Sequence, residues 1–185
     1  MLPIVFDTSA GTVVLVGEGD LVLRRLELLD AAKASVRVFS SAPCKELTVR
    51  AGQRLFGDRP DDDDLEAASL VFGAGLSEAE GQDLAGRARA LGAMVNIEDV
   101  KPLCDFHVPS MVRRGDLTMT ISTGGKSPGL ARRLRRHLEG LFGPEWARHL
   151  EQVGEMRQGW RAEGLPLDEV SRKTDSFIDQ QGWLS

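Results

Sequence analysis

Two adjacent carboxylates, Glu98 and Asp99, follow the apolar run Met94–Ile97 and are the first candidates for chemistry in this sequence. The run has the residue types of a strand, and parallel α/β sheets carry reactive groups just past the carboxyl ends of their strands. A carboxylate at the edge of a cleft acts as a general base or holds a hard cation. The alternative is that Asp99 only caps a turn or short helix beginning at Val100. Strand alternation predicts that Glu98 points to the opposite face.

A glycine turn at residues 17–19 is the second chemical feature. It separates the strand-like run Thr12–Val16 from Asp20–Lys33, where apolar residues recur at helical spacing, and a second strand is predicted at Val36–Phe39. This order is the βαβ context of dinucleotide sites, in which glycines let a pyrophosphate approach the backbone and the N–H groups of a helix N-terminus. The alternative is a structural turn that binds no nucleotide.

The dinucleotide fingerprint is incomplete in two places. Its third small residue falls on Val22, which would push the helix off the strand or force a wider turn. The acidic residue expected at the end of the second strand is missing, and Ser40 and Ser41 stand there. A hydroxyl still bonds a ribose, but it does not choose between NAD and NADP.

A Gly-Gly-Lys-Ser sequence at residues 124–127 suggests a phosphate-binding P-loop, but the first glycine of that motif would fall on Thr120. The better interpretation is a glycine turn, after which Ser127 caps a helix and Pro128 is its first residue. Arginines of this helix lie off its leucine stripe, where they are a solvated face or collect an anionic ligand: Arg132, Arg133, Arg135 and Arg136.

Other patterns predict the elements that position these groups. A short strand is predicted at Leu47–Arg50 and a better one at Ala68–Phe72, which ends in Gly73-Ala74-Gly75. Those glycines either let a ligand lie against the backbone or form a tight exit turn. The four aspartates at 61–64 are predicted to be a solvated loop because like charges follow a proline there.

The second half predicts a hairpin followed by helices. Met111–Arg114 and Leu117–Ser122 flank a Gly-Asp pair typical of a two-residue hairpin turn. Two short strands are too few for an independent sheet, so they are predicted to pair across a dimer that buries Met111, Val112 and Ile121. The tail predicts two further helices, in Pro144–Glu163 and Pro166–Ile178.

Composition excludes several classes of protein. The chain has 185 residues, of which 42% are hydrophobic and 28% charged, as in an ordinary globular protein. A net charge of −5 argues against a nucleic-acid partner. Two distant cysteines and three histidines give no metal-ligand cluster. The separation of the two cysteines favours a reducing, cytoplasmic location. No apolar run approaches the ~20 residues of a membrane span, and the N-terminus lacks the pattern of a signal peptide.

Residues 2–143 resemble the siroheme synthase dehydrogenase–chelatase family, through the segments LPIVFD, VVLVGEGD, VNIED and above all RGDLTMTISTGGKSPGLARRLR. The resemblance implies NAD-dependent oxidation of precorrin-2 to sirohydrochlorin, often followed by insertion of Fe²⁺, the metal substrate, to give siroheme. It also implies an α/β homodimer with an N-terminal Rossmann-like parallel sheet, interlocking dimerisation strands and a C-terminal helical domain. The corresponding ranges are 1–107, 108–143 and 144–185.

The resemblance also assigns residues to the site. The family's key aspartate corresponds to Asp99, the expected catalytic base. NAD is expected at Gly17, Glu18, Gly19, Asp20, Ser40, Gly73 and Ala74. The tetrapyrrole is expected at Asn96, Ser122, Thr123, Gly124, Gly125, Lys126 and Ser127. No resident metal site is expected.

Three departures from the family pattern fall on the nucleotide side: Glu18, Val22 and Gly73. Glu18 replaces a glycine and brings a carboxylate to where a pyrophosphate approaches, so Glu18→Gly is expected to tighten NAD binding. Two alternatives to the full activity stay open. One is a dehydrogenase without chelatase activity; the other is a non-catalytic tetrapyrrole-binding or redox-sensing protein with a decayed nucleotide site.

Overall fold

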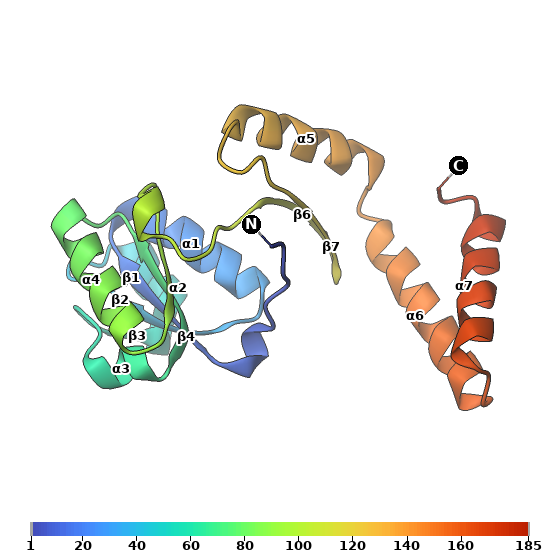
Figure 1. Cartoon of the computed structure of the whole chain (residues 1–185), viewed down its shortest axis with the longest axis horizontal. Helices are drawn as coiled ribbons and strands as arrows, with labels where there is room; N and C mark the ends of the chain where they lie inside the picture. Colours follow the sequence, from blue (N-terminus) through green and yellow to red (C-terminus); the bar gives the residue numbers. More distant parts are fainter. Residues whose placement is uncertain (1, 185) are drawn as a thin grey trace. The chain divides into compact units, whose positions relative to one another are not determined.

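The structure is a computed structural model that describes residues 2–184 (Figure 1). The chain divides into two compact units, Met1–His107 and Val108–Ser185. Within the described residues, no helix combines the length and the apolar character needed to cross a membrane.

The first unit is built on a five-stranded parallel sheet with the order β3-β2-β1-β4-β5. Its strands are β1 (Thr12–Gly17), β2 (Ser35–Phe39), β3 (Leu55–Gly57), β4 (Ala68–Ala74) and β5 (Met94–Ile97). Parallel strands need crossover connections, and the helices supply them: α1 (Gly19–Ala31), α2 (Lys45–Ala51), α3 (Asp62–Glu66) and α4 (Glu78–Ala90). Single 3₁₀ turns lie at Thr8–Ala10, Gly52–Arg54 and Lys101–Leu103. The predicted Rossmann-like α/β fold is confirmed.

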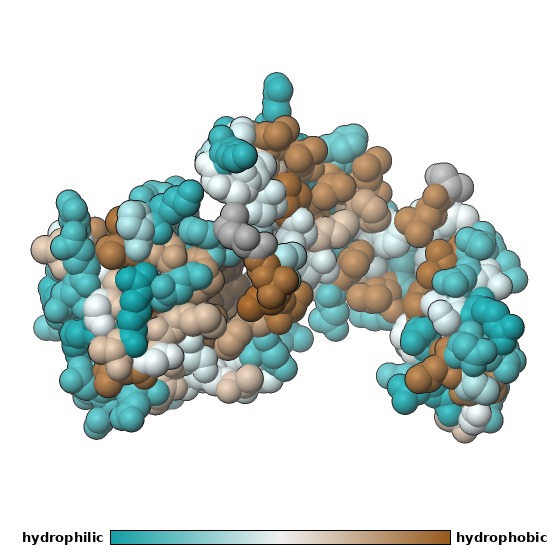
Figure 2. Space-filling view, viewed as in Figure 1, coloured by the Kyte–Doolittle hydropathy of each residue, from teal (hydrophilic) through white to brown (hydrophobic). Residues whose placement is uncertain are grey.

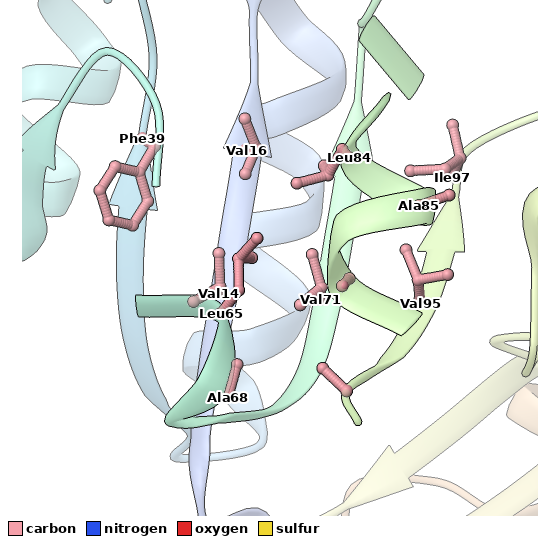
Figure 3. Packing of buried hydrophobic residues seen from close by; sticks show 12 residues of the cluster. Val14, Val16, Phe39, Leu65, Ala68, Val71, Leu84, Ala85, Val95 and Ile97 are labelled. Carbon is pink, nitrogen blue, oxygen red and sulfur yellow. The ribbon is translucent and has the colours of Figure 1, made fainter. Parts of the chain in front are cut away.

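The core explains why β1 and β4 read as continuous apolar runs. Val13, Val14 and Leu15 have no exposed surface, because helices cover both faces of a parallel sheet. One face packs against α4, and Figure 3 shows Val14, Val71 and Leu84 from β1, β4 and α4 in a single cluster. Burying each such side chain is worth about 1.5–3 kcal/mol. The packed sheet therefore holds its carboxyl edge, where the predicted site residues lie, in a fixed arrangement.

One predicted strand is wrong. Residues 47–50 lie in α2, whose N-cap is Cys44, with its sulfur accepting the Leu47 N–H. The run Leu47-Thr48-Val49 suggests a strand by residue type, but the buried side chains Leu47 and Ala51 are four residues apart. That spacing places them on one helical face, and tertiary packing outweighs the β preference of threonine and valine.

The aspartate run is solvated at residues 61–63, as its charge predicts, but it caps and begins a helix instead of forming a loop, and Asp64 is buried. Asp61 caps α3, and Asp64 completes a reciprocal capping box with it. Asp64 is only 7% exposed and pairs with Arg37 of β2, with 2.7 Å between Nη2 and Oδ1. Carboxylates in a first helical turn are favoured by the helix dipole, and the arginine compensates the burial of this one.

The second unit begins with the predicted hairpin, which is confirmed. Strands β6 (Ser110–Arg114) and β7 (Leu117–Ile121) are antiparallel around Gly115, whose φ is 58°. The helices α5 (Pro128–Leu141), α6 (Trp146–Ala162) and α7 (Leu167–Gln181) follow. Helix α5 contacts both strands and α6 packs along α7. Trp183 closes the end of the α6–α7 pair by stacking on His149, with ring centroids 4.0 Å apart.

The leucine stripe of α5 lies largely on the surface. Leu130, Leu134 and Leu141 are 50%, 40% and 58% exposed, and only Ala131 of this helix is buried. Figure 2 shows hydrophobic side chains gathered over the segment that carries α5. An amphipathic helix normally buries such a stripe, so α5 presents an apolar face that nothing within the described chain covers.

Candidate functional site

The turn between β1 and α1 is tied to the end of β4. The Glu18 N–H donates to the Ala74 carbonyl at 3.0 Å. A Cβ at Gly17 would lie 1.9 Å from that same oxygen, so only glycine allows the approach. Gly19 has a φ of 65° and nothing within 4 Å of where its Cβ would be. The turn therefore needs Gly17 for packing inside the protein, whereas Gly19 leaves open space at the start of α1.

Glu18 turns its side chain away from α1. It makes no side-chain hydrogen bond to the N-terminus of that helix, although it is the N-cap residue. Its carboxylate instead accepts hydrogen bonds from Ser40 Oγ at 2.8 Å and from Ser41 N and Oγ at 2.6 and 2.8 Å. Ala42 N–H lies 3.2 Å from both oxygens. The negative charge thus sits at the end of β2 rather than over the helix N-terminus.

These contacts determine the protonation of Glu18. Partial burial by itself raises the pKa of the carboxyl group, but the hydrogen bonds from Ser40, Ser41 and Ala42 together outweigh it and lower the pKa below its ordinary value. Glu18 is therefore an anion at neutral pH. The loop after β2 is folded around that anion.

Val22 is the residue expected from sequence to push the helix off the strand or to force a wider turn. Val22 is fully buried in the core, and α1 begins directly at Gly19. Asp20 is exposed in the first turn of α1, where the helix dipole favours a carboxylate.

Gly73, near the end of β4, and Gly75, just after it, serve close packing within the first unit. A Cβ at Gly73 would lie 2.6 Å from Ile97 Cδ1, and one at Gly75 would lie 2.4 Å from the Glu18 carbonyl oxygen. Gly75 also has a φ of 72°. Of the two interpretations of Gly73-Ala74-Gly75, these contacts favour the tight exit turn. Ala74 is buried and accepts the Glu18 N–H through its carbonyl.

Asp99 follows β5 in a turn with unusual backbone geometry. Its φ is 63°, and its side chain is exposed. The flanking residues fix this turn, because Glu98 N–H donates to the Gly73 carbonyl at 2.8 Å and Val100 N–H to the Ile97 carbonyl at 3.2 Å. The turn therefore presents an exposed carboxylate from a fixed backbone at the carboxyl edge of the sheet.

Glu98 does not simply point into solvent. Its Oε2 lies 3.4 Å from an Arg25 Nη2 of α1, and the two side chains are 24% and 13% exposed. The Arg25 guanidinium in turn lies over the Phe72 ring, 5.1 Å from its centroid. Sequence reasoning missed Arg25 because an arginine on a helix gives no sign of a partner seventy residues later in the chain.

Asn96 and Asp105 hold the segment after β5 in place. Asn96 is 7% exposed, and its amide nitrogen donates to the Phe106 carbonyl at 2.8 Å. Asp105 accepts the Val95 N–H at 3.0 Å and pairs with Arg89. Burial raises the pKa of Asp105, but the contacts with Arg89 and Val95 outweigh this and lower the pKa. The buried Asn96 amide group is thus engaged within the protein.

The predicted substrate residues of the second unit form one compact turn before α5. Thr123 Oγ1 accepts the Ser127 N–H and donates to its carbonyl, both at 3.2 Å. Ser127 caps α5 by accepting the Leu130 N–H, and Pro128 is the first helical residue, as predicted. Ser122 accepts the Gly124 N–H. Gly124 and Gly125 have φ angles of 62° and 78°, and Lys126 is exposed.

The structure therefore brings together the predicted residues of the first unit. Gly17, Glu18, Ser40, Gly73 and Asp99 all lie at the carboxyl ends of β1, β2, β4 and β5, which share one edge of the sheet. Sequence reasoning missed the backbone N–H of Ala42 as a partner of Glu18. The sequence feature that could have indicated this contact is the pair of serines after β2 together with a carboxylate in the glycine turn.

Comparison with known families gives two matches. Residues 4–110 match the model described as putative NAD(P)-binding. Residues 114–141 match the model described as sirohaem biosynthesis protein central. Together these matches span the sheet unit, the hairpin's second strand and α5.

Curated relatives named siroheme synthase match a longer range of the chain. The siroheme synthase of Pseudoalteromonas atlantica is 34% identical over 143 residues, which cover 76% of this chain and 31% of the relative. The siroheme synthase of Thioalkalivibrio sulfidiphilus is 32% identical over 172 residues, 91% of this chain and 33% of the relative. The chain thus spans about a third of the length of these relatives.

A solved structure has the same fold. The protein titled SirC, precorrin-2 dehydrogenase, superposes with a TM-score of 0.80 over 100% of this chain and 93% of its own, at 21% sequence identity. At that identity the superposition establishes the fold, while the chemistry has to be argued from the residues of this chain.

Proposed function

We propose that this chain, which belongs to the family of the siroheme synthase N-terminal module and precorrin-2 dehydrogenase, oxidises precorrin-2 to sirohydrochlorin with NAD as hydride acceptor. The observation that carries the proposal is the edge of the sheet, where a glycine turn, an open helix N-terminus and the exposed carboxylate of Asp99 occur together. Membership of an NAD(P)-binding family gives the class of cofactor. The choice of precorrin-2 as substrate is the more specific part of the proposal.

The residues of the first unit fit a dinucleotide. The first N–H groups of α1 carry no side-chain cap, and Gly19 leaves its surroundings open. A pyrophosphate is held by such N–H groups, and the helix dipole favours its charge. Gly17, Gly19 and Asp20 would lie along it, with Ser40 toward the ribose and Gly73 and Ala74 behind the turn. When bound, NAD supplies the acceptor for a hydride.

Asp99 is proposed as the general base. Oxidation of precorrin-2 removes a hydride and a proton, and the proton needs an acceptor within hydrogen-bond reach. Asp99 offers an exposed carboxylate on a backbone that two hydrogen bonds of its neighbours hold fixed. A proton acceptor that is already held in place loses little conformational entropy on reaching the transition state, and this lowers the activation free energy.

The second unit is proposed to bind the carboxylates of the tetrapyrrole. The turn from Ser122 to Ser127 ends at the N-terminus of α5, where a positive dipole end meets the exposed Lys126. Asn96 completes the set expected from the family, although its amide group is engaged with Phe106. Insertion of Fe²⁺ as a second substrate, giving siroheme, is the further step that we propose for this chain, with Asp99 assisting deprotonation of the pyrroles.

A homodimer is proposed to complete the second unit. A two-stranded hairpin is marginal by itself, and the exposed leucines of α5 present an apolar face. Val112 is already buried within its own chain and pairs with Met119 across the hairpin, so it is not available to an interface. This corrects the expectation that Val112 is buried by the partner.

The test uses purified full-length chain with precorrin-2. With NAD present, the absorption spectrum is expected to change to that of sirohydrochlorin while NADH absorbance rises in equal amount. Addition of Fe²⁺ is then expected to give siroheme faster than the protein-free rate. No NADH above the protein-free control would refute the dehydrogenase, and NADH without accelerated siroheme formation would limit the chain to oxidation.

A further inference from the structure

The carboxylate of Glu18 lies where many NAD-binding folds carry a different acidic residue. In those folds an aspartate or glutamate at the end of the second strand bonds the adenosine ribose. Here β2 ends at Phe39 and is followed by serines. Glu18 reaches this place from the glycine turn, so the missing acidic group is supplied in space although it is absent from the expected position in sequence.

The loop after β2 forms a site built for an anion. The consecutive N–H groups of Ser41 and Ala42 converge on one carboxylate, at 2.6 and 3.2 Å. The hydroxyls of Ser40 and Ser41 add two donors at 2.8 Å. Converging N–H groups of this kind bind phosphate as readily as carboxylate. In this chain the anion that fills the nest of residues 40–42 is part of the protein.

The two arginines that line the cavity beside Glu18 already have carboxylate partners. A small cavity of about 20 Å³ adjoins Glu18 and is lined by two arginines, both already paired. Arg59 pairs with Glu80, and Arg87 pairs with Asp62. Asp58 lines the same cavity as a further carboxylate. NADP-binding folds commonly place a free arginine here for the 2′-phosphate.

We infer that Glu18 sets the cofactor preference of the nucleotide site, by excluding the 2′-phosphate of NADP and by facing the free ribose hydroxyls of NAD. This inference rests on the proposed NAD-dependent function. A 2′-phosphate would meet a nest that is already filled and a like charge beside it. A ribose with a free 2′-hydroxyl is uncharged, so it meets neither this like-charge repulsion nor the need for an empty nest. The sequence predicts that Glu18 repels the pyrophosphate. We infer instead that its carboxylate acts at the adenosine ribose, because it is bound at the end of β2.

The test compares two substitutions in the full chain by titration calorimetry with NAD⁺ and NADP⁺. Glu18→Gly empties the nest, and Glu18→Gln keeps its shape without the charge. Charge-assisted hydrogen bonds of the kind released are worth about a tenfold to hundredfold change in affinity. The preference for NAD⁺ over NADP⁺ is therefore expected to fall at least about tenfold in Glu18→Gly and less in Glu18→Gln.

Asp58→Asn is the matched control, because this carboxylate lines the same cavity without contacting the nest. It is expected to change the preference less than Glu18→Gln does, because Asp58 occupies none of the hydrogen-bond donors of the nest. An equal change in Asp58→Asn and Glu18→Gln would show that general charge is responsible and would overturn the inference.

A second pair of probes separates this inference from the proposed function. Adenosine 2′,5′-bisphosphate and adenosine 5′-monophosphate differ only in the 2′-phosphate and need no nicotinamide site. Glu18→Gly is expected to bind the bisphosphate at least about tenfold more tightly than wild type does, relative to the monophosphate. If the wild-type protein binds no NAD⁺, the proposed function is refuted. The gain of Glu18→Gly in affinity for the bisphosphate can still be measured in that case. A folded Glu18→Gly protein with no gain for either 2′-phosphate compound would refute the role of Glu18.

Discussion

Asp99 has a left-handed backbone, which is uncommon for residues with a side chain. Among the described residues only Asp99 and Lys33 share this feature outside the glycines, with φ of 63° and 55°. Aspartate and asparagine tolerate it better than most residues, and such strain persists where the surroundings fix it. Here the neighbouring N–H groups are bonded to β4 and β5, and the strained residue is the one that both pattern and position single out as a base.

Asp99→Asn tests the base directly, because asparagine accepts the same backbone conformation and changes only the acid–base chemistry. Oxidation of precorrin-2 is expected to fall ~10²–10⁴-fold, the usual cost of losing a positioned proton acceptor. The Asp99 side chain is exposed and makes no hydrogen bond or ion pair within residues 2–184, so thermal melting and NAD binding are expected to stay near wild type. Initial rates of NADH formation measure the effect, and a wild-type rate would exclude Asp99 as the base.

Glu98→Gln is the neighbouring control. The simple alternation of a strand predicts a nearly silent Glu98→Ala, but the contact with Arg25 means that alanine would leave this partly buried arginine without its carboxylate. Glutamine keeps the shape, so activity is expected to fall less than about threefold and stability by about 1 kcal/mol or less. Losses as large as those of Asp99→Asn would indicate that the turn, rather than the Asp99 carboxylate, is what oxidation needs.

Glu18 predicts a pH dependence with a definite sign. The hydrogen bonds from the nest lower the pKa of Glu18 in the folded protein. Ionisation of Glu18 therefore stabilises the folded state relative to the unfolded chain. This contribution to stability is present above the unfolded pKa of about 4.3 and is lost as pH falls through the lower folded value. The melting temperature of wild type is expected to exceed that of Glu18→Gln at pH 7, and the gap should close toward pH 3. A gap that widens on acidification would contradict the ionised nest.

At the scale of elements, the strongly periodic segments could be predicted from sequence. Strands β1, β2, β4 and β5 each carry an apolar run between turn residues, and the capping pairs Ser77 with Glu80 and Ser127 with Pro128 mark two helix starts. These signals are local, so no distant partner is needed to interpret them. The hairpin around Gly115 is of the same kind.

The remaining elements depend on contacts that no local pattern carries. Strand β3 has three residues and pairs only with β2, while α3 relies on the pairing of Asp64 with Arg37. For the candidate site, the glycine turn and Asp99 could be predicted, because their positions follow strand ends. The direction of the Glu18 side chain could not, since it is decided by donors more than twenty residues away.

The exposed stripe of α5 predicts how the hairpin unit assembles. The chain is expected to be a dimer by light scattering at micromolar concentration, with the stripe at its interface. Leu134→Glu is expected to give monomer without unfolding, because this side chain is already 40% exposed in the single chain. Arg133→Glu, on the neighbouring exposed position, is the control for charge and should leave the dimer intact. A wild-type monomer would exclude the dimer, and a dimeric Leu134→Glu would place the interface elsewhere.

At the scale of the whole molecule, the proposed functions are divided between the two compact units. The nucleotide residues and Asp99 lie in the first unit, and the Ser122–Ser127 turn lies in the second. Ligands are therefore expected to affect the two units differently.

Hydrogen exchange on the full chain can separate these effects. NAD is expected to slow exchange at Glu18, Gly19 and Ser41, because those N–H groups lie in the proposed nucleotide site, and to leave the Ser122–Ser127 turn unchanged. Sirohydrochlorin is expected to slow exchange in that turn, because the turn is proposed to bind the carboxylates of the tetrapyrrole. Protection is expected to reach several-fold in each case, as for segments ordered by a bound ligand. A turn that sirohydrochlorin leaves unprotected would contradict the role proposed for Ser122–Ser127, and the groups that bind the tetrapyrrole carboxylates would then have to be sought in the segments that it does protect.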